Sequence, residues 1–175
     1  MKKQDEIQLD FIIDKLTNSI VNTISGDSFQ TEIARFTIKD SKRTTKKNKW
    51  NFNWKLELDN DRNEIYKLTV LHNLNIIQGL LSVKKEADHI FMNLLENAPF
   101  NVGRNKLYEG VAGNLVAFAC KLSFQYGFEG FVSFTSKTNL IDHYEKSLGA
   151  YHFGGHKMII PTHSAKLLVE KYFKT

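Results

Sequence analysis

The sequence predicts an α+β protein with a mixed, mostly antiparallel sheet flanked by helices. Strand-like segments joined by short turns fill most of residues 29–97, and strand and helix patterns alternate from residue 111 onward. Consecutive hairpins followed by strand–helix units give a sheet of this kind. With 175 residues, we expect one domain with a substantial core.

The N-terminal region predicts a helix, a strand and a loop. Apolar residues recur at helical spacing over 6–22, from Leu9 through Ile13 to Ile20. Residues 29–38 are typical of a strand. The basic, threonine-rich run 40–49 predicts a loop.

Residues 50–58 show strict alternation of apolar and polar side chains, which predicts a strand with one dry face. The apolar positions are Trp50, Phe52, Trp54, Leu56 and Leu58. A turn at 59–63 and a strand around 66–70 complete a predicted antiparallel hairpin.

Two central strands are predicted at 74–83 and 89–97. Both carry apolar residues on both faces, which indicates that both faces are covered. The remaining elements are predicted as a helix at 111–126, a strand at 131–134, a helix at 139–148, a strand at 151–160 interrupted by Gly154 and Gly155, and a helix at 162–172.

The net charge of +5 favours polyanionic partners. Part of the excess is local, in Lys42, Arg43, Lys46, Lys47 and Lys49. A nucleic-acid-binding domain is therefore one hypothesis, although the aromatic residues of 50–58 are expected in the core and not on a base-stacking surface.

Other signals are weak. The single cysteine, Cys120, falls in a predicted apolar helix and excludes an internal disulfide. His152 and His156 share a strand face but lack an acidic partner, so no metal site is expected. No segment approaches a membrane span or a secretory signal, and we expect a cytoplasmic protein.

The run from Leu107 to Leu115 has the features of a phosphate-binding helix start. The first turn of a helix presents free amides and the positive end of the dipole. Gly110, Ala112 and Gly113 leave that backbone open to an anion. The alternative is a helix start with small residues for close packing. The Rossmann and Walker patterns are absent.

Two motifs resemble the GNAT superfamily of CoA-dependent acyltransferases. Residues 107–112, Leu-Tyr-Glu-Gly-Val-Ala, are similar to its Q/R-x-x-G-x-G/A signature, except at Leu107. Residues 144–149, Tyr-Glu-Lys-Ser-Leu-Gly, are similar to its Tyr-Glu-Lys-x-Gly segment. The resemblance covers roughly 74–160, the expected CoA-binding core, whereas residues 1–73 form a divergent N-terminal helix and meander.

The resemblance implies a V-shaped splay between two central strands and an acetyl-CoA or other acyl-CoA site. Pantetheine would pair with the strand near Leu94 and Leu95. Arg104 and Lys106 are further candidates for the phosphates. The pyrophosphate would lie on the helix start, at Gly110, Val111, Ala112, Gly113 and Asn114.

Two residues are catalytic candidates. Tyr144 inherits from the resemblance the role of acid for the leaving thiolate. Glu96, at the carboxyl end of its strand, is the candidate base for the attacking amine.

The leading hypothesis is an N-acyltransferase in which an amine attacks the thioester directly. The alternatives are a non-catalytic CoA-binding or protein-interaction module and the nucleic-acid-binding domain. The amine acceptor is not identified by the sequence, and pairing of sheet edges into a homodimer stays open.

Overall fold

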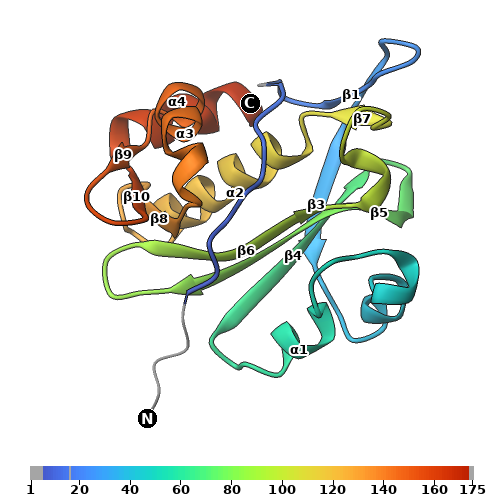
Figure 1. Cartoon of the computed structure of the whole chain (residues 1–175), viewed down its shortest axis with the longest axis horizontal. Coiled ribbons are helices and arrows are strands. Elements are labelled where there is room, and N and C mark those ends of the chain that lie inside the picture. Colours follow the sequence, from blue (N-terminus) through green and yellow to red (C-terminus); the bar gives the residue numbers. More distant parts are fainter. Residues whose placement is uncertain (1–5, 16, 174–175) are drawn as a thin grey trace.

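A seven-stranded mixed sheet forms the centre of the computed structural model, which describes residues 6–15 and 17–173 (Figure 1). Its strand order is β3-β4-β5-β6-β8-β10-β9, and the pair β6–β8 is parallel while the others are antiparallel. The strands are β3 (Thr31–Arg35), β4 (Asn63–Val70), β5 (Asn73–Lys85), β6 (Ile90–Asn97), β8 (Val132–Thr135), β9 (Tyr151–His152) and β10 (Lys157–Ile160).

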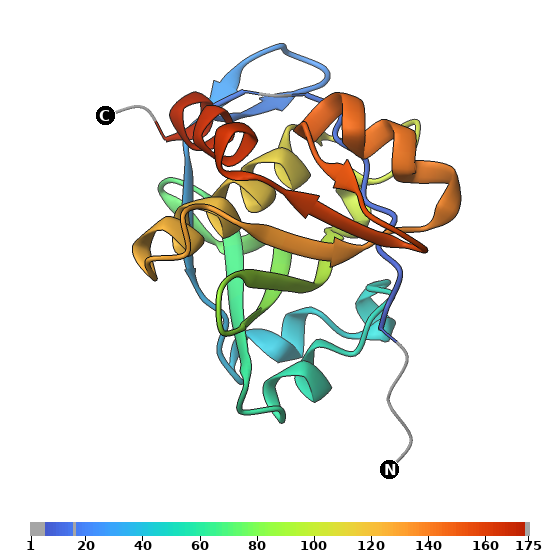
Figure 2. The ribbon, with the colours of Figure 1, turned by 90° about the vertical axis from the view of Figure 1, so that its left-hand side faces the viewer.

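Helices cover both faces of the sheet, which confirms the predicted α+β class. Figures 1 and 2 show three helices on one side: α2 (Val111–Gln125), α3 (Ile141–Leu148) and α4 (Thr162–Tyr172). The short helix α1 (Trp54–Leu58) lies on the other side. A small second sheet contains β1 (Ile20–Asn22), β2 (Ser28–Phe29) and β7 (Tyr108–Glu109) in the order β2-β1-β7.

The two strands predicted to be central, β5 and β6, do lie in the middle of the sheet. The parallel pair β6–β8 is registered only at Ile90–Val132 and Phe91–Ser133, although both strands continue beyond these residues. In β6, Asn93 is the extra residue of a bulge against β5. A bulge bends its strand, so the two strands diverge in the expected V-shaped splay.

The predicted helix at 6–22 is wrong. Residues 6–15, called the strap below, are extended, and Leu9 bridges to Ser136 in parallel orientation. In Figure 1 the dark blue strap crosses from the edge of β6 past α2 toward β1. Leu9, Phe11 and Ile13 are buried while Ile12 is exposed. The true period is therefore two, and Ile12 made it resemble a helical period.

The predicted strand at 50–58 is also wrong. Trp54–Leu58 is helix α1, and the side chain of Asn53 caps it by accepting a hydrogen bond from the Leu56 amide at 3.0 Å. Trp50 and Trp54 are both buried, whereas Leu56 is exposed. The i, i+4 apolar pair Trp54 and Leu58, preceded by the Asn53 cap, was thus present beneath the stronger alternation.

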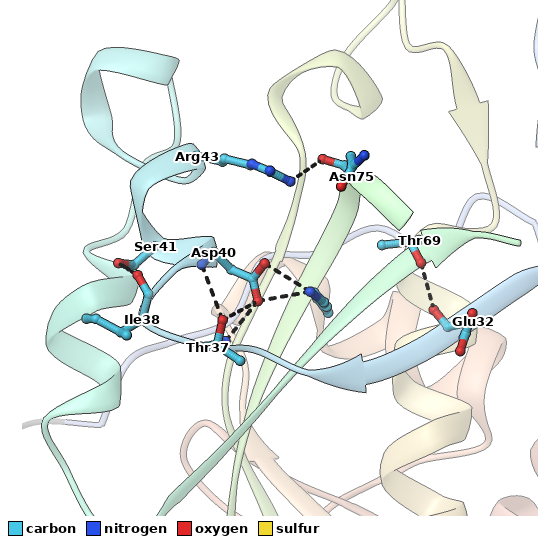
Figure 3. Close-up of polar contacts among 9 residues, drawn as sticks. Glu32, Thr37, Ile38, Asp40, Ser41, Arg43, Thr69 and Asn75 are labelled. Atoms are coloured by element: carbon cyan, nitrogen blue, oxygen red, sulfur yellow. Dashed lines mark hydrogen bonds and ion pairs between the residues drawn. The ribbon is translucent and has the colours of Figure 1, made fainter. Parts of the chain in front are cut away.

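The basic run expected to be a loop contains two short 3₁₀ turns, η1 (Asp40–Arg43) and η2 (Lys46–Asn48). Figure 3 shows how η1 is fastened: the Asp40 carboxylate accepts hydrogen bonds from the backbone amide and hydroxyl of Thr37. It also pairs with Lys67 Nζ of β4 at 2.9 Å. Arg43 donates to the Asn75 carbonyl of β5. The run is therefore held on the sheet.

The second half follows the prediction closely. Helix α2 was expected at 111–126 and α4 at 162–172. Helix α3 follows a 3₁₀ turn, η4 (Thr138–Leu140), and ends at Gly149, whose φ of 66° is the left-handed conformation expected of a terminating glycine. The turn at Gly154 and Gly155 separates β9 from β10.

Candidate functional site

The start of α2 has the geometry of an anion site. Gly110 takes a φ of +95°, which turns the chain from β7 into the helix. No described residue accepts a hydrogen bond from the amides of Val111, Ala112 or Gly113. These three amides and the helix dipole would attract a phosphate or carboxylate.

Two residues of the predicted grip contact protein groups. A Cβ atom on Gly113 would lie 2.1 Å from the Tyr172 hydroxyl, so this glycine admits a side chain of α4. The Asn114 side chain is buried and donates to the Gly110 carbonyl at 2.7 Å and to the Ser19 carbonyl at 3.3 Å. Close packing, the alternative reading of the sequence, thus accounts for Gly113 and Asn114.

A carboxylate of the strap, that of Asp14, already lies at the helix start. Asp14 Oδ1 accepts from the Gly110 amide at 2.9 Å, and Asp14 Oδ2 accepts from Lys106 Nζ at 2.9 Å. The carboxylate and the ammonium are 12% and 25% exposed. A glycine amide and a lysine are the donors that a phosphate oxygen would use, so these residues fit a cofactor phosphate. Arg104 is exposed.

Tyr144 is fully buried on α3, and its hydroxyl donates to the Phe11 carbonyl of the strap at 2.7 Å. Its ring lies 4.6 Å from that of Phe11 and 5.2 Å from that of Phe134 in β8. Burial, with a smaller contribution from the charge of Asp10, raises the pKa of Tyr144. The phenol therefore stays protonated at neutral pH, as a proton donor requires.

The β6 candidates lie in the splayed region. Leu94 and Leu95 are buried past the last β6–β8 register pair. Glu96 is directed to the face that carries α1. Its carboxylate accepts from the Asn51 amide at 2.7 Å, the Phe52 amide at 3.3 Å and Trp54 Nε1 at 2.8 Å. These donors occupy three of the roughly four lone-pair positions of the carboxylate, which a base would need for the proton.

The structure thus brings Lys106, Gly110 and Tyr144 along one path, with the strap between them, and places Glu96 at the α1 face. The sequence did not identify Asp14 and Phe11 as site residues, because a helix at 6–22 would not place them in the cleft. The apolar alternation of Ile7, Leu9, Phe11 and Ile13 was a signal for an extended segment, but Ile12 interrupts it.

A groove of about 1290 Å³ opens beside α1 on the β6–β8–β10 half of the sheet. Strap residue Ile7 lines it together with Leu56, Phe91, Asn93, Thr135 and Phe153. The Glu6 carboxylate accepts from the Thr135 hydroxyl there. The groove therefore lies at the end of the strap that is remote from Asp14.

Within residues 6–15 and 17–173, no three metal-ligating side chains gather, and no helix is long and apolar enough to cross a membrane. Cys120 is buried, and burial raises the pKa of its thiol. A buried, protonated thiol is a poor nucleophile.

Comparison with known proteins gives structural but not sequence matches. No protein-family model matches the chain, and no curated protein matches it. The ribosomal-protein-S18-alanine N-acetyltransferase of Escherichia coli has a TM-score of 0.53 at 13% identity, over 75% of this chain and 90% of its own. The AtaT toxin, solved as a mutant with the antitoxin AtaR C-terminus and acetyl-CoA, has a TM-score of 0.54 at 17% identity, over 79% and 97%.

A spermidine N-acetyltransferase, a chimera of SpeG from Vibrio cholerae, has a TM-score of 0.54 at 12% identity, over 78% of this chain and 98% of its own. These similarities extend over almost the whole of each neighbour. The chain therefore has the fold of the GNAT acetyltransferases, and the resemblance first seen in its two motifs is confirmed at the level of the fold.

Proposed function

We propose that the protein is a GNAT-type N-acyltransferase that moves an acetyl or other acyl group from CoA to an amine. One observation carries the proposal: the amides at the start of α2 and the hydroxyl of Tyr144 border one path, which continues into the splay between β6 and β8. An anion site and a proton donor along one path suit a long thioester cofactor. The neighbour that carries acetyl-CoA supports this choice of cofactor.

In this proposal each site residue has a separate role. The amides of Val111–Gly113 and the ammonium of Lys106 hold the phosphates. An amine attacks the thioester carbonyl, the C–S bond breaks, and Tyr144 protonates the departing thiolate. Water takes the proton from the amine, since the carboxylate of Glu96 is held by three donors. Through these three hydrogen bonds, Glu96 fixes the segment 50–54, which leads into α1 beside the groove.

The binding test is a titration of the purified protein with acetyl-CoA, followed by calorimetry and by the melting temperature. A ligand that binds only the folded state raises the melting temperature. We expect saturable binding and a rise in melting temperature. Absence of both at millimolar acetyl-CoA would contradict the proposal.

The catalytic test is Tyr144→Phe. Loss of the proton donor is expected to lower kcat by about 100-fold, the scale of general acid catalysis, with little change in acetyl-CoA affinity. The matched control is Tyr151→Phe, an exposed tyrosine, which should leave kcat unchanged. Equal kcat values for wild type and Tyr144→Phe would remove Tyr144 from the mechanism.

A second candidate function is a non-catalytic module that binds CoA or a protein partner. The engagement of Glu96 by three donors favours it, because that leaves no free carboxylate base among the proposed site residues. Acetyl-CoA binding without acetylation of any amine in a broad acceptor screen would select this function.

A further inference from the structure

The strap lies along the path that the proposed function gives to the cofactor. We propose that residues 6–15 are an internal occupant of the acyl-CoA cleft, which must leave before the cofactor binds and so sets its apparent affinity. This inference rests on the proposed function and concerns the regulation of that same site. Three separate contacts support it.

The first contact is at the phosphate end. Asp14 brings a negative charge to the Gly110 amide and to Lys106. The carbonyl of Lys15 is 3.2 Å from the position of a Cβ on Gly113, so the strap backbone also covers the first turn of α2. A phosphate oxygen and the Asp14 carboxylate cannot occupy the same donors at once.

The second contact is a strand pairing in the splay. The Leu9 amide donates to the Thr135 carbonyl at 2.7 Å, and the Lys137 amide donates to the Leu9 carbonyl at 3.1 Å. The Ser136 amide, between Thr135 and Lys137 in the chain, donates instead to the His156 carbonyl on the side of β10. Because successive residues of a strand direct their backbone groups to opposite edges, Leu9 pairs with the edge of β8 that faces β6. The strap therefore lies in the gap between β8 and β6, the gap that pantetheine must enter to pair with Leu94 and Leu95 of β6.

The third contact is at Tyr144 and lies between the other two along the strap. The Phe11 carbonyl accepts the hydrogen bond of Tyr144, and the Phe11 ring packs on Tyr144 and Phe134. The neighbouring Ile13 amide donates to His143 Nε2 at 3.0 Å. While the strap is docked, the Tyr144 hydroxyl has no proton to offer to a thiolate. The strap therefore occupies the anion site, the hydroxyl of Tyr144 and the gap between β8 and β6 at the same time.

The strap is also built to come away as a unit. It is a single extended segment whose buried side chains, Leu9, Phe11 and Ile13, alternate with exposed ones. Its outer ion pair, Asp10 with Lys137, is about half exposed on both sides. Release breaks no helix of the described chain. A cleft that is docked 99% of the time lowers the apparent cofactor affinity by about 100-fold.

Two substitutions loosen the strap at two different contacts. Asp14→Asn weakens the phosphate end, and Phe11→Ala removes the packing on Tyr144. We expect each to tighten acetyl-CoA binding about tenfold in calorimetry. The control for charge alone is Glu109→Gln, next to Gly110 but outside the strap, which should change the affinity far less.

The decisive variant locks the strap with a disulfide, Asp10→Cys with Lys137→Cys. These positions are exposed and adjacent, and the natural Cys120 is buried and cannot interfere. The oxidised protein should fail to bind acetyl-CoA, and the reduced form of the same protein should bind it. The oxidised and reduced forms have the same sequence, so each form is the control for the other.

The outcomes separate the two proposals. Loss of binding on oxidation, with recovery on reduction, supports the strap as occupant. Equal binding by the oxidised and reduced forms overturns the strap proposal and leaves the acyltransferase proposal standing. Absence of binding in every form, Asp14→Asn and Phe11→Ala included, overturns the acyltransferase proposal and the strap proposal with it.

Discussion

At the scale of single residues, Glu96 shows how one carboxylate can hold a whole segment. Its two oxygens accept hydrogen bonds from the Asn51 and Phe52 amides and from the indole N–H of Trp54, which is fully buried. Without this acceptor, the buried indole N–H of Trp54 and the two backbone amides would lose their partner, and the loss is costly for the buried donor. The position of α1 on the sheet thus depends on an acid that the sequence suggested for catalysis.

Replacing Glu96 by Gln tests this role. The amide group turns a donor toward other donors, and we expect a loss of about 2 kcal/mol in the free energy of unfolding, measured with urea. Glu86→Gln, which breaks an exposed pair with Arg62, should cost less than about 0.5 kcal/mol. If Glu96→Gln keeps full stability and loses only turnover, the residue is the base after all.

Asp40 makes a prediction about pH. Burial alone would raise its pKa, but hydrogen bonds from Lys67 and Thr37 outweigh burial and lower the pKa below the ordinary 3.8. A lowered folded-state pKa means that stability is present above the unfolded-state value and is lost as the pH falls through the folded value.

Asp40→Asn should therefore destabilise by about 2 kcal/mol at pH 7, where the buried pair with Lys67 is broken. The difference from wild type should shrink as the pH falls below about 4. Urea unfolding curves between pH 7 and pH 3 give the measurement. A difference that does not change with pH would show that the charge of Asp40 is not the source.

At the scale of elements, the start of α2 depends on one glycine. Gly110 combines a φ of +95° with a Cβ position only 3.0 Å from the Ser19 carbonyl. Gly103 has a similar φ of +83° but nothing within 4 Å. Alanine substitutions at these two glycines therefore separate the free-energy cost of the backbone conformation from that of the steric contact.

Gly103→Ala is expected to cost about 1 kcal/mol for the left-handed conformation alone. Gly110→Ala should cost clearly more, because the methyl group also pushes β1 away from the helix start. Thermal unfolding of the two variants measures the difference. Equal losses would mean that the contact with Ser19 relaxes freely.

The elements also show what the sequence could and could not predict. The second half was predictable, because its helices carry their own apolar period, and Gly127 and Gly149 mark the ends of α2 and α3. The strap was not, since its structure comes from pairing with β8 and α3, more than a hundred residues away. Helix α1 was missed because the apolar residues of 50–58 alternate without a break, whereas the helix has only five residues and its Asn53 cap.

The candidate site divides in the same way. The position of Gly110 at a helix start and of Tyr144 on the following helix could be read from local patterns. The partners that determine what these residues do, Asp14 and Phe11, are distant in sequence. The three donors around Glu96 likewise come from a segment more than forty residues away.

At the scale of the whole molecule, the strap should open more readily than the sheet. The Gly110 amide has Asp14 as its partner, although it adjoins α2. In native-state hydrogen exchange we therefore expect the Gly110 amide to follow the rates of Leu9 and Ile13, while strands β5 and β6 exchange far more slowly.

Locking the strap with the Asp10–Lys137 disulfide should slow the exchange of the Leu9, Ile13 and Gly110 amides together and leave β5 unchanged. If these amides instead exchange only with global unfolding in the unlocked protein, the strap does not open by itself. That result would argue against a displaceable occupant.

The pairing of Leu9 with Ser136 has a consequence for the order of events during synthesis. The strap leaves the ribosome before its partners in β8 and α3, which follow more than a hundred residues later, at about 5–20 residues per second. The strap is thus made early but cannot reach its native place until those partners have been made. A ligand in the cell meets the newly completed cleft at the same moment as the strap, and the two compete for it from the beginning of the protein's life.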